Sequence, residues 1–141
     1  MVNVVCAIII KEGKILVTQL GSKSDHPYKW EFPGGKVKSG ESPEDTIIRE
    51  IKEELQISIQ VKQTLEAISY NYGFKEICLI PFICEIIEGN PVLTEHIQLN
   101  WITFDELQEL NLVEADRAVA CLGKNQNEIL NFLSENMNGC C

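Results

Sequence analysis

The sequence lacks the features that mark membrane, secreted and multidomain proteins. Its apolar runs fall well short of the roughly 18 uninterrupted apolar residues that a membrane-spanning helix needs. The opening run VNVVCAIII has no basic stretch before it and is cut short by KEGK, which indicates a strand rather than a signal peptide. No internal repeat, low-complexity tract or linker divides the chain. We therefore expect a cytoplasmic protein, without a membrane partner, that folds as a single domain over residues 1–141.

Positive charge is also scarce. The chain has 12 lysines and arginines against 21 aspartates and glutamates, for a formal net charge of -9. Because broad binding to nucleic acid relies on basic surface, a nucleic acid polymer is not an expected partner. A small anionic ligand would need bound cations to bridge it to so acidic a protein. The expected assembly is a monomer or a homodimer.

The usual zinc-binding patterns are absent. None of the six cysteines forms a CxxC pair, and only two histidines are present, so a zinc site is not expected. Cys6, Cys78 and Cys84 lie in apolar, strand-like runs, where free cysteine packs as a small hydrophobic residue. Cys140 and Cys141 are interpreted as an exposed tail, with prenylation as a less favoured alternative.

The predicted elements mix strands and helices. VNVVCAIII and ILVTQL flank a turn with a glycine and predict a hairpin, and a polar loop over residues 21–29 follows. After a helix that begins near residue 43, ISIQVKQTLEAISYNY and KEICLIPFICEII predict two strands joined at Gly73, and HIQLNWIT predicts a third. FDELQEL, EADRAVACL and NEILNFLSEN are predicted helices, and residues 125–141 form a C-terminal helix and tail. This order favours an α/β or α+β sandwich over a helical bundle.

The helix after the double glycine has clear sequence signals. Ser42 can cap it, Pro43 fits its first position, and Asp45 completes an S-x-x-D capping box. Apolar residues at helical spacing span an arc of roughly 100° and predict its buried face; they are Ile47, Ile48, Ile51 and Leu55.

The same helix gathers three carboxylates on one face. Glu50, Glu53 and Glu54 are related by i, i+3 and i+4, and such like charges repel by a few tenths of a kcal/mol each. Mg²⁺ or Mn²⁺ would compensate, since hard cations prefer carboxylate oxygens. Arg49 can reach Glu53 four residues on. The alternative is an exposed acidic face with a surface ion pair worth at most about 1 kcal/mol.

The surrounding residues decide between these two interpretations. Read from Gly35, the chain runs G-x5-E-x7-R-E-I-x-E-E, and residues 35–57 closely resemble the Nudix box of hydrolases that act on nucleoside diphosphates linked to another group. Gln56 stands where that box has a glycine. Because glutamine adopts the left-handed conformation less readily, we expect a slightly altered helix exit with the carboxylates unaffected.

The resemblance implies a fold and an activity. It implies a Nudix-type α/β/α sandwich in which a mixed, curved sheet lies between helices. KWEFPGGKV is similar to the MutT branch, which cleaves nucleoside triphosphates, including oxidised ones such as 8-oxo-dGTP, to the monophosphate and pyrophosphate. The similarity extends from residue 3 to about residue 120.

The resemblance also implies site residues. The metal ligands would be Gly35, through its carbonyl oxygen, together with four carboxylates: Glu50, Glu53, Glu54 and Glu95. Either Glu50 or Glu95 would take the proton of the attacking water, and the sequence does not choose between them. Arg49 would hold Glu53 in place, and Lys36 would meet a phosphate. The alternative for Glu95 is an ordinary loop residue.

Base recognition is implied for three further residues. Asp116 stands where the MutT branch has a base-reading residue; ionised, it would accept from an exocyclic amine of cytosine or adenine, and protonated by burial it would still read oxidised guanine. Its alternative role is a helix N-cap. Phe32 and Tyr72 are candidate stacking surfaces, with core packing as the alternative. Gln19 and Leu20 replace a phosphate-binding arginine, for which Lys23, His26 or Lys29 would substitute.

Two other functions stay open. A second enzyme interpretation keeps the box but changes the substrate to a nucleoside diphosphate sugar or a dinucleoside polyphosphate. A third interpretation is a nucleotide-binding Nudix module without turnover. Such modules typically lose glutamates of the box, and this chain has all of them, which favours an enzyme.

Overall fold

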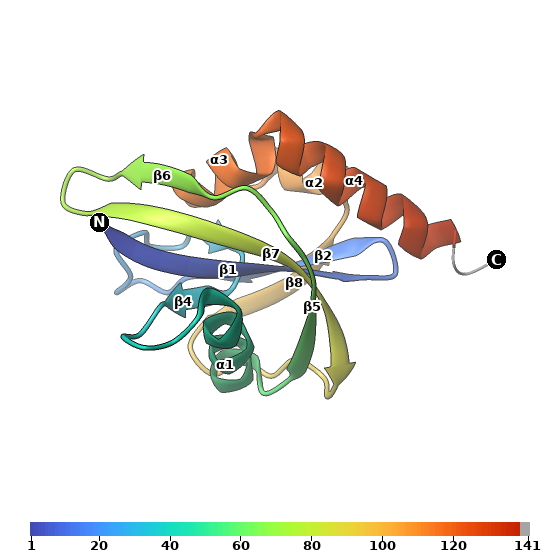
Figure 1. The fold of residues 1–141 in the computed structure, drawn as a ribbon, viewed down its shortest axis with the longest axis horizontal. Helices are drawn as coiled ribbons and strands as arrows, with labels where there is room; N and C mark the ends of the chain where they lie inside the picture. The colour runs from blue at the N-terminus through green and yellow to red at the C-terminus, as the bar shows by residue number, and fades with distance from the viewer. Residues whose placement is uncertain (139–141) are drawn as a thin grey trace.

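A mixed sheet of eight strands forms the centre of the molecule in this computed structural model, which describes residues 1–138 (Figure 1). Cys140 and Cys141 lie outside the described residues. The strands are β1 Val2–Lys11, β2 Lys14–Gln19, β3 Trp30–Glu31, β4 Gly34–Lys36, β5 Ser58–Thr64, β6 Ile68–Asn71, β7 Glu76–Glu88 and β8 Gln98–Ile102. The helices are α1 Pro43–Leu55, α2 Phe104–Glu109, α3 Glu114–Cys121 and α4 Gly123–Asn138.

The helices cover both faces of this sheet, as the predicted sandwich requires. Figure 1 shows α1 on one face and α2, α3 and α4 on the other. Strand β1 pairs in parallel with β7, whereas the other strand pairs are antiparallel, so the sheet is mixed. Residues 5–10 of β1 are buried without a break, which is the pattern of a strand covered on both faces.

Side chains of β1 alternate between two hydrophobic cores. Val5, Ala7 and Ile9 pack with the buried face of α1, whereas Cys6 and Ile8 point to the core beneath α3 and α4. The apolar arc predicted on α1 is confirmed at three of its four positions, because Ile47, Ile51 and Leu55 are fully buried. Ile48, the fourth, is 40% exposed. No helix within residues 1–138 is long and apolar enough to cross a membrane.

The residues at the two ends of α1 explain where the helix begins and ends. Ser42 Oγ accepts a hydrogen bond of 3.1 Å from the Asp45 N–H, and Pro43 occupies the first turn, as predicted. The expectation of an altered helix exit is wrong. Gln56 takes the left-handed conformation (φ 57°, ψ 34°), and its N–H donates to the Lys52 carbonyl. Leu55 and Ile57 on either side are fully buried, and this packing outweighs the roughly 1–2 kcal/mol that a left-handed backbone costs a residue with a Cβ.

The structure divides residues 57–72 differently from the sequence prediction. This run forms two strands, β5 and β6, which both pair with β7. Between them the Leu65 N–H donates to the Pro81 carbonyl, and the buried Asn125 of α4 bonds both the N–H and the carbonyl of Glu66. At Leu65 and Glu66 these hydrogen bonds take the place of the strand pairing that would continue if the run formed one long strand.

The double glycine forms a strand that the sequence did not predict. Strand β4 pairs with β1, with Gly34 opposite Cys6 and Gly35 opposite Val5. A Cβ atom on Gly34 would lie only 1.9 Å from the Val5 carbonyl oxygen, so the backbones can approach this closely only with glycine. This contact brings the start of the Nudix-like segment against the centre of the sheet.

Candidate active site

One arginine organises the carboxylate face of α1. Arg49 binds Glu41 through two parallel hydrogen bonds, with Nε at 2.7 Å and Nη2 at 2.9 Å from the two carboxylate oxygens. Its Nη1 also lies 3.0 Å from Glu50 and 3.2 Å from Glu53. The predicted contact with Glu53 is therefore confirmed, but the principal partner is Glu41. The Arg49 hydrogen bonds lower the pKa of Glu41 to about 2.

Glu50 reaches from α1 to β4. A Cβ atom built on Gly35 would lie 2.3 Å from the Glu50 carboxyl carbon, so the absence of a side chain at Gly35 makes room for this carboxylate. Burial raises the pKa of Glu50; the hydrogen bond and charge of Arg49 oppose this effect, and the neighbouring Glu53 and Glu95 add to it. The backbone of Gly35 and the Glu50 carboxylate thus lie side by side.

Glu54 is the most deeply buried carboxylate of the helix. It is 5% exposed, and its Oε2 has no hydrogen-bond partner among the described residues. Its pKa is raised to about 9, chiefly by burial and also by the charges of Glu31, Glu95 and Glu50, while a hydrogen bond from the backbone of Gly34 opposes them. A buried carboxylate oxygen without a partner is unfavourable unless a cation or proton compensates it.

These carboxylates are suited to a hard divalent cation, but they are not yet arranged around one. Within residues 1–138, no three His, Cys, Asp or Glu side chains already surround a common cation position. Arg49 instead holds Glu50 and Glu53. Glu95 lies in the exposed loop between β7 and β8, near enough to Glu50 and Glu54 to raise the pKa of both. The donor set and the unpartnered Glu54 oxygen fit such an ion.

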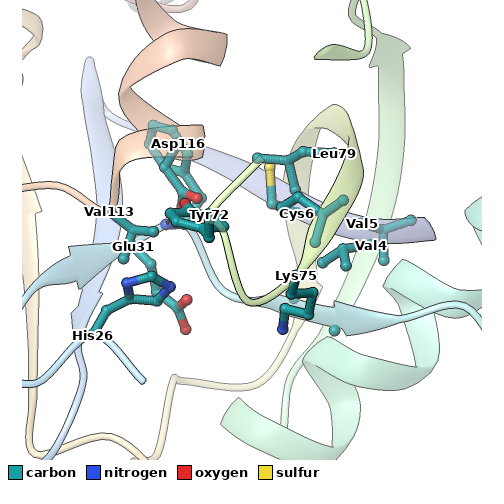
Figure 2. Close-up of a pocket in the computed structure, with 14 residues that line it drawn as sticks. Val4, Val5, Cys6, His26, Glu31, Tyr72, Lys75, Leu79, Val113 and Asp116 are labelled. Carbon is teal, nitrogen blue, oxygen red and sulfur yellow. Dashed lines mark hydrogen bonds between the residues drawn. The ribbon is translucent and has the colours of Figure 1, made fainter. Parts of the chain in front are cut away.

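A cavity of about 150 Å³ adjoins this carboxylate face (Figure 2). Glycines 34 and 35 of β4 form one part of its wall, so it begins where Glu50 meets the sheet. Its polar and aromatic lining comes from segments far apart in the sequence: Cys6, His26, Glu31, Tyr72, Lys75 and Asp116.

Asp116 is the buried acid of this cavity. It is 6% exposed, and its Oδ2 accepts a hydrogen bond of 2.8 Å from the Phe32 N–H. Burial raises the pKa of Asp116 well above its ordinary value, and the nearby charge of Glu31 adds to this effect. The alternative role as a helix N-cap is wrong, because α3 begins at Glu114 and its N-cap residue is Val113.

The two candidate stacking residues differ. Phe32 is 2% exposed and packs in the core beneath α3, but it also lines the cavity, where its backbone N–H donates to Asp116. Its role as a stacking surface stays a prediction. Tyr72 is half-buried and lines the cavity. Its hydroxyl accepts a hydrogen bond of 2.8 Å from the Ala115 N–H, and its ring centre lies 4.6 Å from that of His26.

Of the predicted phosphate contacts, Lys36 and Lys29 lie outside the cavity lining, whereas His26 is part of it. Lys36 is exposed on β4, next to the glycines. Lys29 forms a close ion pair with Glu114, and the His26 ring lies against Tyr72, so both side chains have partners within the protein. A phosphate contact that replaces the missing arginine stays a prediction. Gln19, at the arginine position, donates through its amide to the Tyr28 carbonyl and braces the loop over residues 21–29.

Sequence reasoning missed Glu31 and Lys75 as cavity residues. Glu31 lies in a strand of two residues, too short for any periodicity to show which way its side chain points. Lys75 follows the turn at Gly73, where a lysine is most often solvated surface. In neither case did the sequence alone hold a signal that could have found them.

Known proteins share this architecture and this box. The family profile described as the NUDIX domain matches residues 1–122. The chain belongs to the NUDIX domain family. The interpretation as a Nudix hydrolase acting on acid anhydrides is confirmed, and hydrolases of this family generally need a divalent metal. Helix α4 lies beyond the matched residues.

Several relatives of this Nudix chain carry names. A CTP pyrophosphohydrolase of Escherichia coli (strain K12) is 34% identical over 116 residues, which cover 82% of this chain and 86% of that protein. An 8-oxo-dGTP diphosphatase of Buchnera aphidicola subsp. Schizaphis graminum (strain Sg) is 36% identical over 109 residues, or 77% of this chain and 82% of the relative. The solution structure of MutT from methicillin-resistant Staphylococcus aureus 252 is 36% identical, covers 93% and 96% of the two chains, and has a TM-score of 0.71. The resemblance to the MutT branch is thus confirmed.

Proposed function

We propose that this Nudix hydrolase cleaves nucleoside triphosphates, ribo or deoxy, to the monophosphate and pyrophosphate. The observation that supports this proposal is that the cavity and the acidic face of α1 meet at Gly35. The cavity that ends at Asp116 and Tyr72 begins at Gly35, against which the Glu50 carboxylate lies. A nucleotide with its base beside Asp116 would therefore direct its phosphates toward the acidic face of α1.

The acidic face would hold Mg²⁺, with Mn²⁺ as an alternative. The proposed ligands are the Gly35 carbonyl oxygen and the carboxylates of Glu50, Glu53, Glu54 and Glu95. A bound divalent ion supplies charge neutralisation at the phosphate and acidifies the attacking water. Glu50 or Glu95 accepts the proton of that water. Arg49, which is held by its ion pair with Glu41, orients the Glu50 and Glu53 carboxylates through its own ion pairs with them. Lys36 contacts a phosphate at the exposed edge of the site.

The base preference depends on the proton of Asp116. Because Asp116 is buried and its pKa is raised, the protonated form is favoured, and this form can donate to a base. Protonated Asp116 supports oxidised guanine nucleotides such as 8-oxo-dGTP as substrates. Ionised Asp116 would instead favour the exocyclic amine of cytosine, and the named relatives include enzymes of both kinds. Mutation avoidance is the cellular role that goes with the first preference.

The test is a substrate panel. Purified protein with Mg²⁺ is incubated with canonical and oxidised nucleoside triphosphates, and monophosphate, pyrophosphate and orthophosphate are quantified. We expect equal amounts of monophosphate and pyrophosphate, with 8-oxo-dGTP preferred. Cleavage of nucleoside diphosphate sugars or dinucleoside polyphosphates without any triphosphate cleavage would overturn the proposal. Binding of nucleotides without turnover would support a non-catalytic module instead.

Asp116→Asn provides the matched variant for base choice. Asparagine keeps the shape and both donates and accepts without a proton equilibrium. We expect the variant to retain 8-oxo-dGTP cleavage and to lose any cleavage of cytosine nucleotides that depends on the ionised acid. An unchanged ratio of the two activities would contradict base reading by Asp116.

A further inference from the structure

His96 makes a buried contact that the roles assigned so far leave unused. It follows Glu95 in the loop between β7 and β8, and its side chain is only 3% exposed. Its Nε2 lies 2.8 Å from Oε2 of Glu31, and its Nδ1 has no hydrogen-bond partner among the described residues. Since an ionised carboxylate only accepts, Nε2 carries the proton that is donated to Glu31.

The partner, Glu31, lies between the cavity and the acidic face of α1. Its carboxylate lines the cavity, and Figure 2 shows Glu31 and Asp116 entering that cavity from different elements. The charge of Glu31 also affects Glu54 on the acidic face of α1. The Glu31 side chain is 24% exposed, and its carboxylate is held by the hydrogen bond from His96.

We propose that His96 is a positioning residue that holds the Glu31 carboxylate toward the nucleobase, so that His96 acts on base discrimination through Glu31. This inference rests on the proposed function, because it assumes a base in the cavity. Glu31 then supplies an acceptor separate from Asp116, and two acids in fixed places distinguish bases by their patterns of donors and acceptors. A Glu31 free to rotate would accept from many bases with similar strength.

The strand pairing explains why His96 lies next to Glu31. Gln19 of β2 pairs with Trp30 of β3 on one side and with Gln98 of β8 on the other. Residues 31 and 96 therefore approach each other across the end of β2, and the Ile97 N–H donates to the Gln19 carbonyl at that point. This backbone hydrogen bond holds the loop beside residue 96 through the main chain, independently of the His96 side chain.

A set of variants separates this role from a general structural one. His96→Leu removes the donor while keeping an apolar side chain in the buried position, and His96→Gln restores an N–H at a similar reach. Glu31→Ala and the double variant His96→Leu with Glu31→Ala complete a double-mutant cycle. The measurements are kcat and KM for 8-oxo-dGTP, dGTP and dCTP at saturating Mg²⁺.

We expect His96→Leu to change the ratio of kcat/KM between the preferred and the other nucleotides by about tenfold, the size of a hydrogen bond to a charged group. The change should lie mainly in KM, because base contacts form in both the ground state and the transition state. His96→Gln should restore most of the ratio, and His96→Leu should have little further effect when Glu31 is already alanine.

Other results would overturn the proposal. If His96→Leu lowers kcat equally for all nucleotides and raises the Mg²⁺ requirement, His96 supports Glu95 rather than base choice. Equal effects of His96→Leu in the presence and absence of Glu31 would show that the histidine does not act through this carboxylate. An unchanged ratio would show that the contact has no part in base discrimination.

A spectroscopic measurement separates this inference from the proposed function. In the ligand-free protein, ¹⁵N-labelled imidazole spectra should show a proton on Nε2 of His96 that exchanges slowly and whose signal moves in Glu31→Ala. Absence of that proton, or a signal unaffected by Glu31→Ala, overturns the positioning role whatever the substrate. A wild-type protein that cleaves no triphosphate but gives the expected spectrum overturns the proposed function alone.

Discussion

At the scale of single residues, Glu54 shows most clearly how burial shapes this site. Its carboxylate is nearly inaccessible, one of its oxygens has no partner among the described residues, and its pKa is raised to about 9. Without a cation, the folded protein therefore keeps a proton on Glu54 at pH values where the unfolded chain has lost it. A bound cation would remove the need for that proton.

The first prediction concerns the metal-free protein. Because the folded pKa of Glu54 is about 9 and its ordinary value is 4.5, folding binds a proton between these pH values, and the free energy of unfolding falls as pH rises. This single group contributes a slope of at most about 1.4 kcal/mol per pH unit. Glu54→Gln should remove it, so the variant gains stability relative to wild type between about pH 6 and about pH 8.5.

Urea unfolding in the presence of a chelator measures this difference. Glu109→Gln, at an exposed position at the end of α2, is the control and should follow the wild-type profile. Parallel pH profiles for wild type and Glu54→Gln would contradict the raised pKa of Glu54.

The second prediction concerns Glu53. Its side chain is 56% exposed and has Arg49 as its ion-pair partner, so Glu53→Gln removes a charge without disturbing the core. We expect a loss of about 100-fold or more in Mg²⁺-dependent kcat/KM, because a proposed metal ligand is lost. The melting temperature should stay unchanged. Glu44→Gln, at an exposed position on the same helix, is the control and should keep full activity; wild-type activity in Glu53→Gln would remove Glu53 from the ligand set.

At the scale of secondary structure, α1 combines a well-formed start with an unfavourable end. Ser42 and Pro43 form the start that their residue types predict. At the other end Gln56 is held in a left-handed conformation that glycine would adopt with less strain. The helix nevertheless ends at this residue, because the buried Leu55 and Ile57 determine the path of the chain.

The third prediction tests that strain. Gln56→Gly should raise the free energy of unfolding by about 0.5–1 kcal/mol, since glycine avoids the clash of Cβ with the backbone. Gln60→Gly, at an exposed position in β5, is the matched control and should lower stability by about 0.5–1 kcal/mol. Urea denaturation of both variants measures the two changes in the free energy of unfolding, which should have opposite signs. A destabilised Gln56→Gly would mean that the glutamine side chain contributes more than its strained backbone removes.

At the scale of the whole molecule, α4 completes the fold although the NUDIX profile ends at residue 122. Ile129 is fully buried and Leu133 is 7% exposed, and both belong to the core that also contains Cys6 and Phe32. Asn125 of the same helix is buried and bonded to the segment between β5 and β6. Ile129 and Leu133 of α4 therefore contribute to the hydrophobic core, and the helix lies on one face of the sheet.

The fourth prediction measures this contribution. Ile129→Ala should lower the free energy of unfolding by about 2–5 kcal/mol, because it opens a cavity in the core. Leu130→Ala, at the next residue and 42% exposed, should change it by about 0.5 kcal/mol or less. Both variants should keep the wild-type kcat/KM at a temperature where they are folded, since neither residue lines the site. Equal effects of the two substitutions on stability would contradict the packing of α4 against the core.

The sequence by itself determined the features that depend on neighbouring residues. The start of α1, its buried face and the common face of its glutamates follow from spacing within about a dozen positions, and the Nudix box identifies the same segment. The hairpin of β1 and β2 depends on a short turn. Such features are predictable because a helix or hairpin brings together residues that are already close in the chain.

Only the tertiary structure decided how the rest of the site is assembled. Glu31 meets His96 because β3 and β8 both pair with β2, and Asp116 meets the Phe32 backbone because α3 packs where β3 ends. Burial, which raises the pKa values of Glu54 and Asp116, also arises only when both faces of the sheet are covered. The sequence contains these side chains, but their neighbours and their access to water are set by contacts between residues far apart in the chain.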